Sequence, residues 1–471
     1  MPTRPQSDLV IAANRLPVHR SSPEHGWETS PGGLVSALLP ILRRDRGVWV
    51  GWGGSTGSVI DPFEHDGFAC APVELSEREL EEYYAGFSNR TLWPLYHDAC
   101  QQPEFRRRWW HTYVEINRRF AHAISESAAP GAKVLVQDYH LQLVPGMLRE
   151  LRSDVRIGFF LHIPFPPTEL FAQLPWRSRI LEGLLGADVV GFQTRSGAQN
   201  FQRLVGRYTG HRPQGGAVRI GDRWVQARAF PISIDVKRFE ELAARPEIRA
   251  RAQEIRRDLG EDRTILLGVD RLDYTKGIDI RLRALQDLLA SGRRTVDDIV
   301  MVQISVPSRE LVEDYVDLRS RVEELVGKIN GNHAKVGRIP VHYLRRSLPI
   351  EELVPHYVAA DVMVVTPLRD GMNLVAKEYV ACRRENTGVL VLSEFAGAAR
   401  ELRDALLVNP HDIDGMSEAF ARAAEMPPEQ QQRRMRAMRR RIRRRTVYDW
   451  VDEFMGAVEE SSASRAAGSH A

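Results

Sequence analysis

The stretch DVMVVTPLRDGMNLVAKE, from Asp361 to Glu378, decides how the fold of this chain is interpreted. Its apolar run ends abruptly at Thr366. Such a continuous run is typical of a strand that is buried on both faces of a parallel sheet. Asp370-Gly371 and a helix-like segment follow, so the turn opens at the carboxyl edge of the sheet, where ligands bind. The unpaired N–H groups at the start of that helix favour an anion, and the two acids would accept hydrogen bonds from hydroxyl groups beside it.

The same alternation of short apolar runs and longer amphipathic segments continues along the chain, which is typical of strand–helix units and a parallel sheet. A length of 471 residues predicts two domains. We place the break at Phe230–Phe239, ahead of a long charged helix over Ala243–Leu259. The predicted strands are Leu9–Ala13, Val48–Gly51, Val134–Gln137, Ile157–Leu161 and Val189–Phe192 in the first half, and Ile265–Val269, Ile299–Ile304, Val341–Leu344, Val362–Val365, Val389–Leu392 and Leu406–Val408 in the second.

The composition is that of an ordinary globular protein, with 43% apolar and 27% charged residues. The net charge of +3 gives no reason to expect nucleic acid. The arginine-rich run Arg433–Arg445 has little aromatic interleaving, so a solvated face or a contact between subunits is favoured over base stacking. Three distant cysteines, no signal peptide and no apolar run long enough for a membrane span predict a cytoplasmic protein without membrane partners.

The segment GVDRLDYTKGI, Gly268–Ile278, is the second strong pattern. A predicted strand runs into a turn that presents Arg271 and Lys276. Two cations at a strand end suit a diphosphate, because they hold it and neutralise the charge that grows on it as a leaving group. The alternative is that both cations form surface ion pairs with Asp270 and Asp273. Together with the Asp370 segment, the pattern favours a sugar joined to a phosphate.

Further phosphate-binding groups follow other predicted strands. Arg15 comes after the first strand of the chain, and Arg309 after a strand of the second half. Gly32-Gly33 precedes an amphipathic helix and would allow close approach of phosphate oxygens, although a simple helix-entry turn is the more frequent explanation of paired glycines. We therefore include these residues as candidates.

Aromatic and polar residues of the first half are candidates for sugar contacts. Tyr84 and Trp93 could form a platform beside a sugar ring, although core packing is the more frequent role of such residues. His162 ends a buried strand and is either a structural residue or, with Asp138 at a neighbouring strand end, a polar contact to a sugar.

Common catalytic motifs are absent from the sequence. It contains no HExxH, no P-loop, no GxSxG and no GxGxxG after a strand. No DxD-type acidic pair stands where it would hold a divalent ion. We therefore expect neither a metal nor a cofactor, so that positive side chains would have to do the work of a metal.

A series of motifs runs along the chain, in the order NRLP, WVGW, SNRTLWP, VQDYHL, FLHIPFPP, GFQT, FPISID, GVDRLDYTKGI, TPLRDGMNLVAKEYV and LSEFAGAA. Together they closely resemble the trehalose-6-phosphate synthases, which form glycosyltransferase family 20. The likeness extends from about residue 8 to residue 455. Two departures, FPISID for the common FPIGID and PPTE for the frequent PTPE, remove no expected contact.

The resemblance implies an α/β fold of the GT-B type, in which two Rossmann-like, doubly wound parallel-sheet domains face each other across a cleft. Residues 1–235 would form the acceptor-side domain and residues 236–445 the donor-side domain. Residues 446–458 would form a helix that crosses back to the first domain, followed by a disordered tail over residues 459–471. We also expect a homo-oligomer, either a dimer or a tetramer.

The resemblance further implies a retaining, metal-independent transfer of glucose from a nucleotide-glucose donor to glucose 6-phosphate. The products would be α,α-trehalose 6-phosphate and a nucleoside diphosphate, with UDP-glucose as the usual donor and GDP-glucose as the second choice. The leaving phosphate would itself take the acceptor proton, so catalysis would consist of positioning and electrostatic stabilisation. The alternatives are a glucosylglycerol-phosphate synthase or a pseudo-glycosyltransferase of the same family, or a sugar-phosphate sensor without activity.

By that likeness the candidate site residues fall into three overlapping groups. The catalytic group is Asp138, His162, Arg271, Lys276 and Asp370. The donor-binding group is Gly32, Gly33, His162, Arg271, Lys276, Asp370, Asn373, Leu374, Val375 and Glu378. The group that binds the acceptor, glucose 6-phosphate, is Arg15, Tyr84, Trp93, Asp138 and Arg309.

Overall fold

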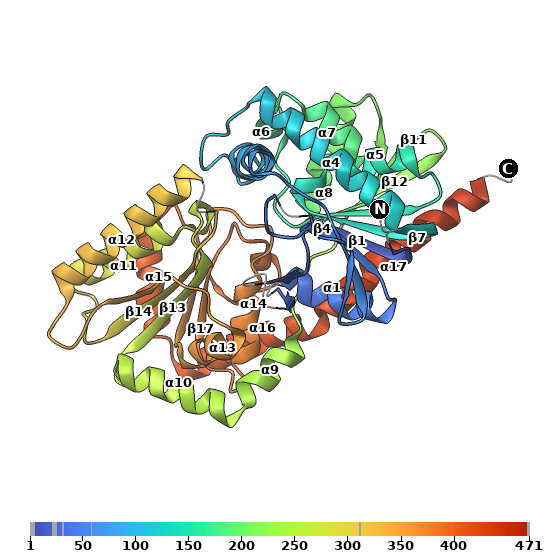
Figure 1. The fold of residues 1–471 in the computed structure, drawn as a ribbon. Helices are drawn as coiled ribbons and strands as arrows, with labels where there is room; N and C mark the ends of the chain where they lie inside the picture. The colour runs from blue at the N-terminus through green and yellow to red at the C-terminus, as the bar shows by residue number, and fades with distance from the viewer. Residues whose placement is uncertain (1–4, 21–25, 31–32, 58, 310–311, 469–471) are drawn as a thin grey trace. The chain divides into compact units, whose positions relative to one another are not determined.

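The computed structural model describes residues 5–20, 26–30, 33–57, 59–309 and 312–468. The chain forms two compact units: unit 1 is Met1–Ile232 with Tyr448–Ala471, and unit 2 is Ser233–Val447 (Figure 1). The boundary at Ile232 lies inside the segment Phe230–Phe239, where the sequence predicts the break between domains. Each unit has its own sheet, and the two are described separately below.

Unit 1 contains a ten-stranded sheet in the order β10-β11-β12-β9-β8-β7-β1-β4-β6-β5. The strands from β12 to β6 are parallel, and β10, β11 and β5 pair antiparallel at the edges. The strands are β1 (Ser7–Arg15), β4 (Val48–Trp52), β5 (Phe63–His65), β6 (Phe68–Pro72), β7 (Ala128–Gln137), β8 (Arg156–Leu161), β9 (Val189–Phe192), β10 (Pro213–Gln214), β11 (Ala217–Ile220) and β12 (Arg223–Ala229). Strands β2 (Val18–His19) and β3 (Glu28–Thr29) form a separate pair.

The helices of unit 1 are α1 (Gly33–Arg44), α2 (Glu77–Glu79), η1 (Leu80–Leu92), α3 (Trp93–Tyr96), α4 (Arg107–Ser127), η2 (Tyr139–Leu141), α5 (Val144–Leu151), α6 (Thr168–Phe171), α7 (Arg177–Leu184), α8 (Arg195–Tyr208) and α17 (Val447–Gly468). A reciprocal cap starts α2, in which Ser76 and Glu79 each bond the backbone N–H of the other. The segment η1 that follows is a π-helix of 13 residues. Such helices are rare and are frequently found at functional sites.

Two glycines in neighbouring strands explain how α17 packs on the sheet of unit 1. A Cβ atom added to Gly158 in β8 would lie 2.7 Å from Val458 and 3.1 Å from Phe454, both on α17. A Cβ atom added to Gly191 in β9 would lie 2.9 Å from Phe454. The indole N–H of Trp450 also donates to the Phe230 carbonyl oxygen at 3.1 Å. The last described helix is therefore part of the core of unit 1.

Replacing Gly158 with valine should lower the stability of unit 1 by about 1–3 kcal/mol, because the larger side chain overpacks the surface under α17. Urea unfolding followed by tryptophan fluorescence measures this, since Trp450 lies in the affected layer. Gly26→Val is the matched control, because no atom lies within 4 Å of a Cβ added there. Equal midpoints for the two variants would contradict the packing argument.

Unit 2 contains a six-stranded sheet in the order β15-β14-β13-β16-β17-β18, and every neighbouring pair is parallel. The strands are β13 (Thr264–Arg271), β14 (Ile299–Val306), β15 (Val341–Leu344), β16 (Val362–Val365), β17 (Val389–Ser393) and β18 (Leu406–Val408). All residues of β16 and β17 are buried, as predicted for central strands covered on both faces. The predicted α/β class with two doubly wound sheets is confirmed.

The helices of unit 2 are α9 (Val236–Ala244), α10 (Pro246–Leu259), η3 (Tyr274–Lys276), α11 (Ile278–Ala290), α12 (Glu313–His333), α13 (Ile350–Ala359), α14 (Leu374–Cys382), η4 (Gly397–Arg400), α15 (Ile413–Ala424) and α16 (Pro428–Arg444). The prediction of one long helix over Ala243–Leu259 is wrong. Arg245 has extended backbone (φ −62°, ψ 135°), because the Pro246 ring disfavours a helical residue before it, and a new helix starts at the proline.

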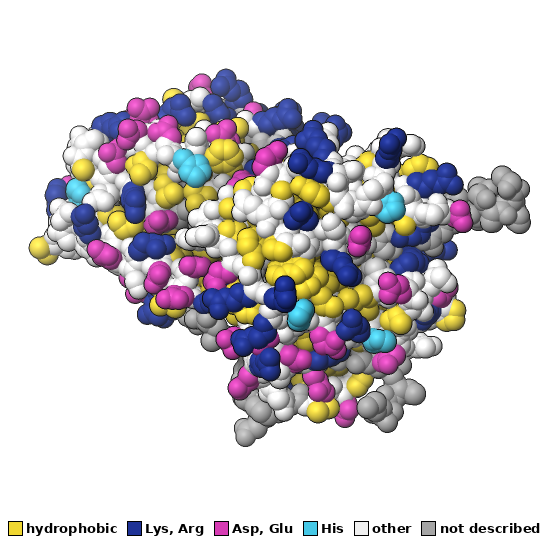
Figure 2. Space-filling model, turned by 90° about the horizontal axis from the view of Figure 1, so that it is seen from above, with side chains coloured by type: hydrophobic (Ala, Val, Ile, Leu, Met, Phe, Trp, Pro, Cys, Tyr) yellow, Lys and Arg dark blue, Asp and Glu magenta, His cyan; other side chains and the backbone are white. Residues whose placement is uncertain are grey.

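The arginine-rich run of α16 is largely engaged within unit 2. The Arg439 guanidinium, 6% exposed, donates to Glu240 at 2.8 Å and to the Arg384 carbonyl oxygen at 2.7 Å. Arg441 donates to Asp404 at 2.6 Å. These hydrogen bonds therefore hold helix α16 against the rest of unit 2. On the face in Figure 2, basic side chains are interspersed with acidic ones, so that face carries no broad basic field for nucleic acid.

Two differences from the predicted organisation concern the edges and the end of the chain. Strands β5, β6, β10, β11 and β12 extend the sheet of unit 1 and were not predicted: β5, β10 and β11 are short and β12 is polar, whereas β6 is a buried apolar run that the prediction missed. Helix α17 continues to Gly468, into the tail over residues 459–471 that was predicted to be disordered. Among the described residues, no helix is both long and apolar enough to cross a membrane.

Candidate active site

The strand order identifies a ligand-binding edge in each unit. In unit 1 the order reverses at β1 and β7, because β4 and β6 lie beyond β1 while β8 and β9 lie beyond β7. In unit 2 it reverses in the same way at β13 and β16. Ligands of open α/β sheets bind outside the carboxyl ends of the strands at such a reversal. Arg15, Asp138, Arg271 and Asp370 all lie at or after the ends of these strands.

Asp138 follows β7 with a backbone that residues other than glycine rarely adopt (φ 71°, ψ 172°). Its carboxylate oxygen Oδ1 accepts a hydrogen bond from the His162 backbone N–H at 3.2 Å. Its own N–H donates to the Phe160 carbonyl oxygen at 2.8 Å. Strain of this kind costs about 1–3 kcal/mol and is concentrated at functional sites, so the geometry supports Asp138 as a site residue.

His162 lies directly after β8 and is half-buried. Its Nε2 atom is 2.9 Å from the Oε1 atom of Gln137, a side chain that is fully buried. Because an amide oxygen only accepts, Nε2 carries the proton and Nδ1 is left as an acceptor. Burial lowers the pKa of His162 to about 3. The imidazole is therefore neutral at physiological pH and is suited to hydrogen bonding rather than to charge stabilisation.

His162 should remain neutral with a protonated Nε2 atom from pH 5 to pH 8. A nitrogen-15 NMR titration of the imidazole, assigned by comparison with His162→Gln, measures this directly. Since the folded-state pKa is lowered, the unfolded chain binds the proton more readily, and this residue reduces stability as the pH falls below about 6.5. A titration midpoint above pH 5 would contradict the assignment.

The aromatic candidates of unit 1 differ in their surroundings. Tyr84 lies in the π-helix η1, is half-buried and stacks on His140 with ring centroids 5.8 Å apart and an interplanar angle of 9°. The Asn89 side chain donates to the Tyr84 carbonyl oxygen at 2.8 Å and accepts from the Tyr139 hydroxyl at 2.9 Å. Trp93, 3% exposed, packs on Tyr139, so it lies in the core that its residue type favours.

The remaining candidates of unit 1 are Arg15, Gly32 and Gly33. Arg15 is exposed, and its guanidinium lies 4.8 Å from the centre of the Trp52 ring. Gly33 is the first residue of α1, at a helix end where backbone N–H groups have no partner within the helix. Gly32 lies outside the described residues.

In unit 2, three of the predicted donor-binding residues, Lys276, Asp370 and Asn373, form one cluster. The Lys276 ammonium group donates to Asp370 Oδ2 at 2.6 Å, and the Asn373 amide donates to the same oxygen at 3.2 Å. Gly277, with φ 61°, makes this approach feasible, because a Cβ atom there would lie 2.3 Å from the Thr366 carbonyl oxygen. The loops after β13 and β16 therefore meet, as the two motifs together predict.

Asn373 precedes helix α14 with φ 82°, and its Oδ1 atom accepts from the Ala376 N–H at 3.2 Å. The next two residues, Leu374 and Val375, begin the helix, and N–H groups at such positions have no acceptor within the helix itself. With the positive end of the helix dipole, they form a site suited to an anion next to Lys276.

Arg271 and Arg309, the two candidate arginines of unit 2, both lie near the buried carboxylate of Asp273. Arg309 donates to Asp273 Oδ2 at 2.9 Å, with side chains that are 3% and 0% exposed. The guanidinium of Arg271 is 3.9 Å from the same oxygen and 46% exposed. Burial alone would raise the pKa of Asp273, but the charges of Arg309, Arg271 and Lys276 hold it below its usual range. The predicted ion-pair alternative is met in part by Arg271, which lies near Asp273 but is about half exposed, whereas Lys276 pairs with Asp370.

Beneath these loops lies a buried network around Arg281, which is fully buried. Its Nη1 atom donates to Asp270 at 2.7 Å and to Gln303 at 2.8 Å, and its Nε atom donates to the Thr366 hydroxyl at 3.0 Å. Burial raises the pKa of Asp270 despite the neighbouring Arg281 charge. The network joins the end of β13 and the middle of β14 to the residue that follows β16, so it supports the loops that carry Arg271, Lys276 and Asp370.

Several residues of these clusters were missed by sequence reasoning. Gln137 and His140 flank Asp138 in the VQDYHL motif, so their position was the available signal. Asp273 was considered only as an ion-pair partner. Tyr357 donates to Glu378 Oε2 at 2.8 Å from helix α13, where the sequence shows only a helical apolar pattern. Within the described parts of the chain, no group of His, Cys, Asp and Glu could hold a metal ion.

Comparisons with known proteins identify the family of this chain. A model of glycosyltransferase family 20 matches residues 7–460. The trehalose-6-phosphate synthase of Mycolicibacterium smegmatis is 56% identical over 464 residues, 96% of this chain and 92% of that protein. A UDP-forming alpha,alpha-trehalose-phosphate synthase from Burkholderia xenovorans, solved in complex with glucose-6-phosphate, is 36% identical, with a TM-score of 0.88 and coverage of 96% of this chain and 99% of that one. A structure from E. coli, described as trehalose-6-phosphate bound with UDP-2-fluoro glucose, is 34% identical, with a TM-score of 0.88 and coverage of 96% and 98%.

These matches extend over nearly the whole chain and confirm the predicted GT-B fold class and the predicted enzyme class, a hexosyltransferase. The motifs from which the resemblance was drawn lie within the matched residues. The chain therefore belongs to glycosyltransferase family 20.

Proposed function

We propose that this enzyme transfers glucose from UDP-glucose to glucose 6-phosphate with retention of configuration, giving α,α-trehalose 6-phosphate and UDP. The observation that carries the proposal is the cluster of Lys276, Asp370 and Asn373 at the start of helix α14. It combines a cation and helix N–H groups for a diphosphate with a carboxylate for sugar hydroxyls. The relatives from B. xenovorans and E. coli hold a sugar phosphate and a UDP-sugar analogue.

Unit 2 would bind the donor. Arg271 and Lys276 would hold the diphosphate, and the N–H groups of Leu374 and Val375 would reach its oxygens from the helix end. The Asp370 carboxylate, held by Lys276 and Asn373, would accept from a glucose hydroxyl. Glu378, half-buried on α14, would accept from the ribose hydroxyls.

Unit 1 would bind the acceptor. Arg15, exposed at the end of β1, would pair with the phosphate of glucose 6-phosphate. The half-buried Tyr84 ring would contact the sugar, and Trp93 would shape the pocket from beneath. Asp138 would orient a hydroxyl group near the reacting atoms, and the neutral His162 would bond a hydroxyl of the donor glucose. Arg309 would join the acceptor phosphate from its ion pair with Asp273.

The reaction follows from these roles. The bond between C1 of glucose and the diphosphate oxygen breaks, and a bond forms between C1 and the anomeric oxygen of glucose 6-phosphate. The proton of that anomeric hydroxyl moves to the departing phosphate oxygen on the same face, which preserves the configuration. Arg271 and Lys276 stabilise the charge that develops on the diphosphate, so the described cations supply electrostatic catalysis.

The test incubates the purified protein with UDP-, GDP- or ADP-glucose, each against glucose 6-phosphate and glycerol 3-phosphate. Release of nucleoside diphosphate is followed, and the anomeric couplings of the product are read by proton NMR. We expect UDP release with glucose 6-phosphate and an α,α-linked product. Faster release with GDP-glucose would reassign the donor, and release with glycerol 3-phosphate alone would favour the sibling synthase. Absence of release with every donor would overturn the proposal.

We further propose that the enzyme works in the cytoplasm as a homo-oligomer. The free, buried Cys70 and Cys382 suit a reducing compartment. Multi-angle light scattering of the purified protein should give the mass of a dimer or tetramer of the 53.5 kDa chain.

A further inference from the structure

We propose that Tyr357 is a positioning residue for the donor ribose, acting through Glu378. Its hydroxyl group donates to Glu378 Oε2 at 2.8 Å, which leaves Oε1 to accept from a ribose hydroxyl. Tyr357 itself is fully buried on α13, while Glu378 is half-buried on α14. The inference rests on the proposed function, which places the ribose on Glu378.

A carboxylate in this position needs a fixed hydrogen-bond donor. Burial raises the pKa of Glu378, and the bond from Tyr357 opposes that rise because it favours the charged form. Only the charged form can accept with both oxygens, whereas a protonated carboxyl would compete as a donor with the ribose hydroxyls. Tyr357 therefore does two things at once: it fixes the rotation of the carboxylate and favours its acceptor state.

The other titratable groups nearby do not replace this role. Cys382 lies one turn further along α14, and burial together with the Glu378 charge keeps its thiol neutral by raising its pKa. Asp270 faces Tyr357 from the end of β13 with its own partner, Arg281, at 2.7 Å. Among the described residues, the hydrogen bond that a side chain donates to the Glu378 carboxylate comes from the Tyr357 hydroxyl group.

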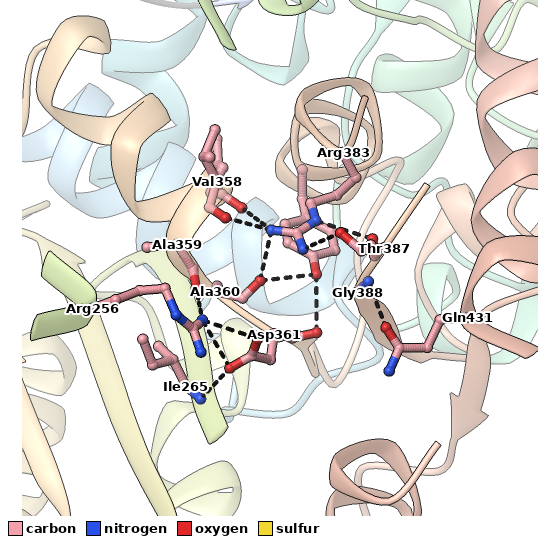
Figure 3. A network of polar contacts seen from close by, with 12 residues as sticks. Arg256, Ile265, Val358, Ala359, Ala360, Asp361, Arg383, Thr387, Gly388 and Gln431 are labelled. Atoms are coloured by element: carbon pink, nitrogen blue, oxygen red, sulfur yellow. Dashed lines mark hydrogen bonds and ion pairs between the residues drawn. The ribbon is translucent and has the colours of Figure 1, made fainter. Parts of the chain in front are cut away.

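The helix end that carries Tyr357 is held by two arginines, Arg383 and Arg256, which Figure 3 shows beside the backbone that follows Tyr357. The Arg383 guanidinium donates to the carbonyl oxygens of Tyr357 at 3.3 Å, Val358 at 2.5 Å and Ala360 at 2.9 Å. Arg256 donates to the Ala359 carbonyl oxygen at 2.6 Å. Two cations at the carboxyl end of a helix also favour its dipole, so the end of α13 is fixed in place.

The same network fixes the partner helix. Arg383 is the residue that directly follows α14, so the side chain that holds the end of α13 belongs to the end of the helix that carries Glu378. The helices that carry Tyr357 and Glu378 are thus joined through the Arg383 side chain. A packing role alone would need a buried aromatic ring at this position, but it would not need a hydroxyl group directed at this particular carboxylate.

Tyr357→Phe removes one oxygen atom and retains the ring. In this variant the KM for UDP-glucose should rise about three- to tenfold, the loss typical of one ordinary hydrogen bond, because Tyr357 acts on the ribose only through Glu378. The KM for glucose 6-phosphate and the kcat should change less than twofold. For 2′-deoxy-UDP-glucose the KM should hardly change, so the preference for the ribose hydroxyl should shrink. The acid limb of UDP binding, measured by calorimetry, should move to higher pH because the pKa of Glu378 rises further.

Tyr379→Phe is the matched control. Tyr379 is also fully buried and lies next to Glu378 in the chain, but its hydroxyl donates to the Asp361 carbonyl oxygen at 3.2 Å. This variant should keep the kinetic constants of the wild type. Circular dichroism checks that both variants fold. Glu378→Gln is the second probe: it should lose the same preference for the ribose hydroxyl, and adding Tyr357→Phe to it should change nothing more.

The outcomes separate this inference from the function on which it rests. Equal increases in KM for both donors, or the same increase in Tyr379→Phe, would assign Tyr357 a merely structural role and overturn the inference. Additive effects of Tyr357→Phe and Glu378→Gln would do the same. If instead the wild-type enzyme releases no UDP from UDP-glucose and glucose 6-phosphate, the proposed function fails, and calorimetry with UDP alone still tests the Tyr357 effect.

Discussion

Lys276→Ala should lower kcat by about 10²- to 10³-fold while the protein stays folded. Lys276 is 8% exposed, and its ammonium group lies 2.6 Å from Asp370 at the helix end of α14. A preorganised charge in such a place stabilises the developing diphosphate charge far more than the same charge in water. Loss of Lys276 also leaves the Asp370 carboxylate unneutralised beside the donor phosphates, which adds repulsion. Steady-state UDP release measures the effect.

The control for this variant is Lys237→Ala. Lys237 is on α9, its side chain is 86% exposed, and its nearest recorded acid is Glu241 at 3.8 Å. This substitution removes the same charge and should leave kcat within a factor of two. Turnover of Lys276→Ala near that of the wild type would remove Lys276 from the catalytic group and, with it, the main electrostatic element of the proposed site.

Arg281→Ala should destabilise unit 2 by about 3–5 kcal/mol, because it leaves the buried Asp270 carboxylate without its cation. The bonds to Gln303 and to the Thr366 hydroxyl are lost in the same change. Gly268 lies directly against the Arg281 guanidinium, since a Cβ atom there would be 2.3 Å from Nη1. Because glycine has no side chain, it cannot fill the space that the guanidinium would leave. Urea unfolding followed by far-UV circular dichroism measures the loss.

The two units can be distinguished in that experiment. All 9 tryptophans have sequence numbers within unit 1, so fluorescence follows unit 1 while circular dichroism follows both units. The matched control is Arg283→Ala, an exposed arginine on the same helix, α11, which should shift the midpoint very little. An unfolding midpoint for Arg281→Ala equal to that of Arg283→Ala would contradict a supporting role for the network.

The sheets were predictable because their strands carry continuous apolar runs. Every strand predicted from such a run is present, and the runs around Val362–Val365 and Val389–Ser393 are buried throughout. The short strands β5, β10 and β11 and the polar strand β12 gave no such signal, whereas the buried run of β6 was missed. Pro246 marks the break after Arg245 in the sequence, but the charged pattern on both sides of it led to the prediction of a single helix.

The candidate site was predictable where a motif places charged residues next to a strand end. The approach of Lys276 to Asp370 follows from two motifs at adjacent strands, although the strands are far apart in the chain. The buried ion pair between Arg309 and Asp273 could not be foreseen, because exposure and tertiary partners are not encoded in local spacing. The same limit applies to the tautomer of His162, which depends on Gln137 from a neighbouring strand.

The return of α17 to unit 1 also bears on how the protein is made. The chain leaves unit 1 at Ile232 and re-enters it at Tyr448, and the Val447 N–H donates to the Ile234 carbonyl oxygen at 3.1 Å where the two connections meet. During synthesis, all of unit 2 leaves the ribosome before the helix that covers Gly158 and Gly191 exists. Unit 1 therefore starts first but can complete its core only last, so a nascent chain that stalls after unit 2 would expose the apolar surface meant for Phe454.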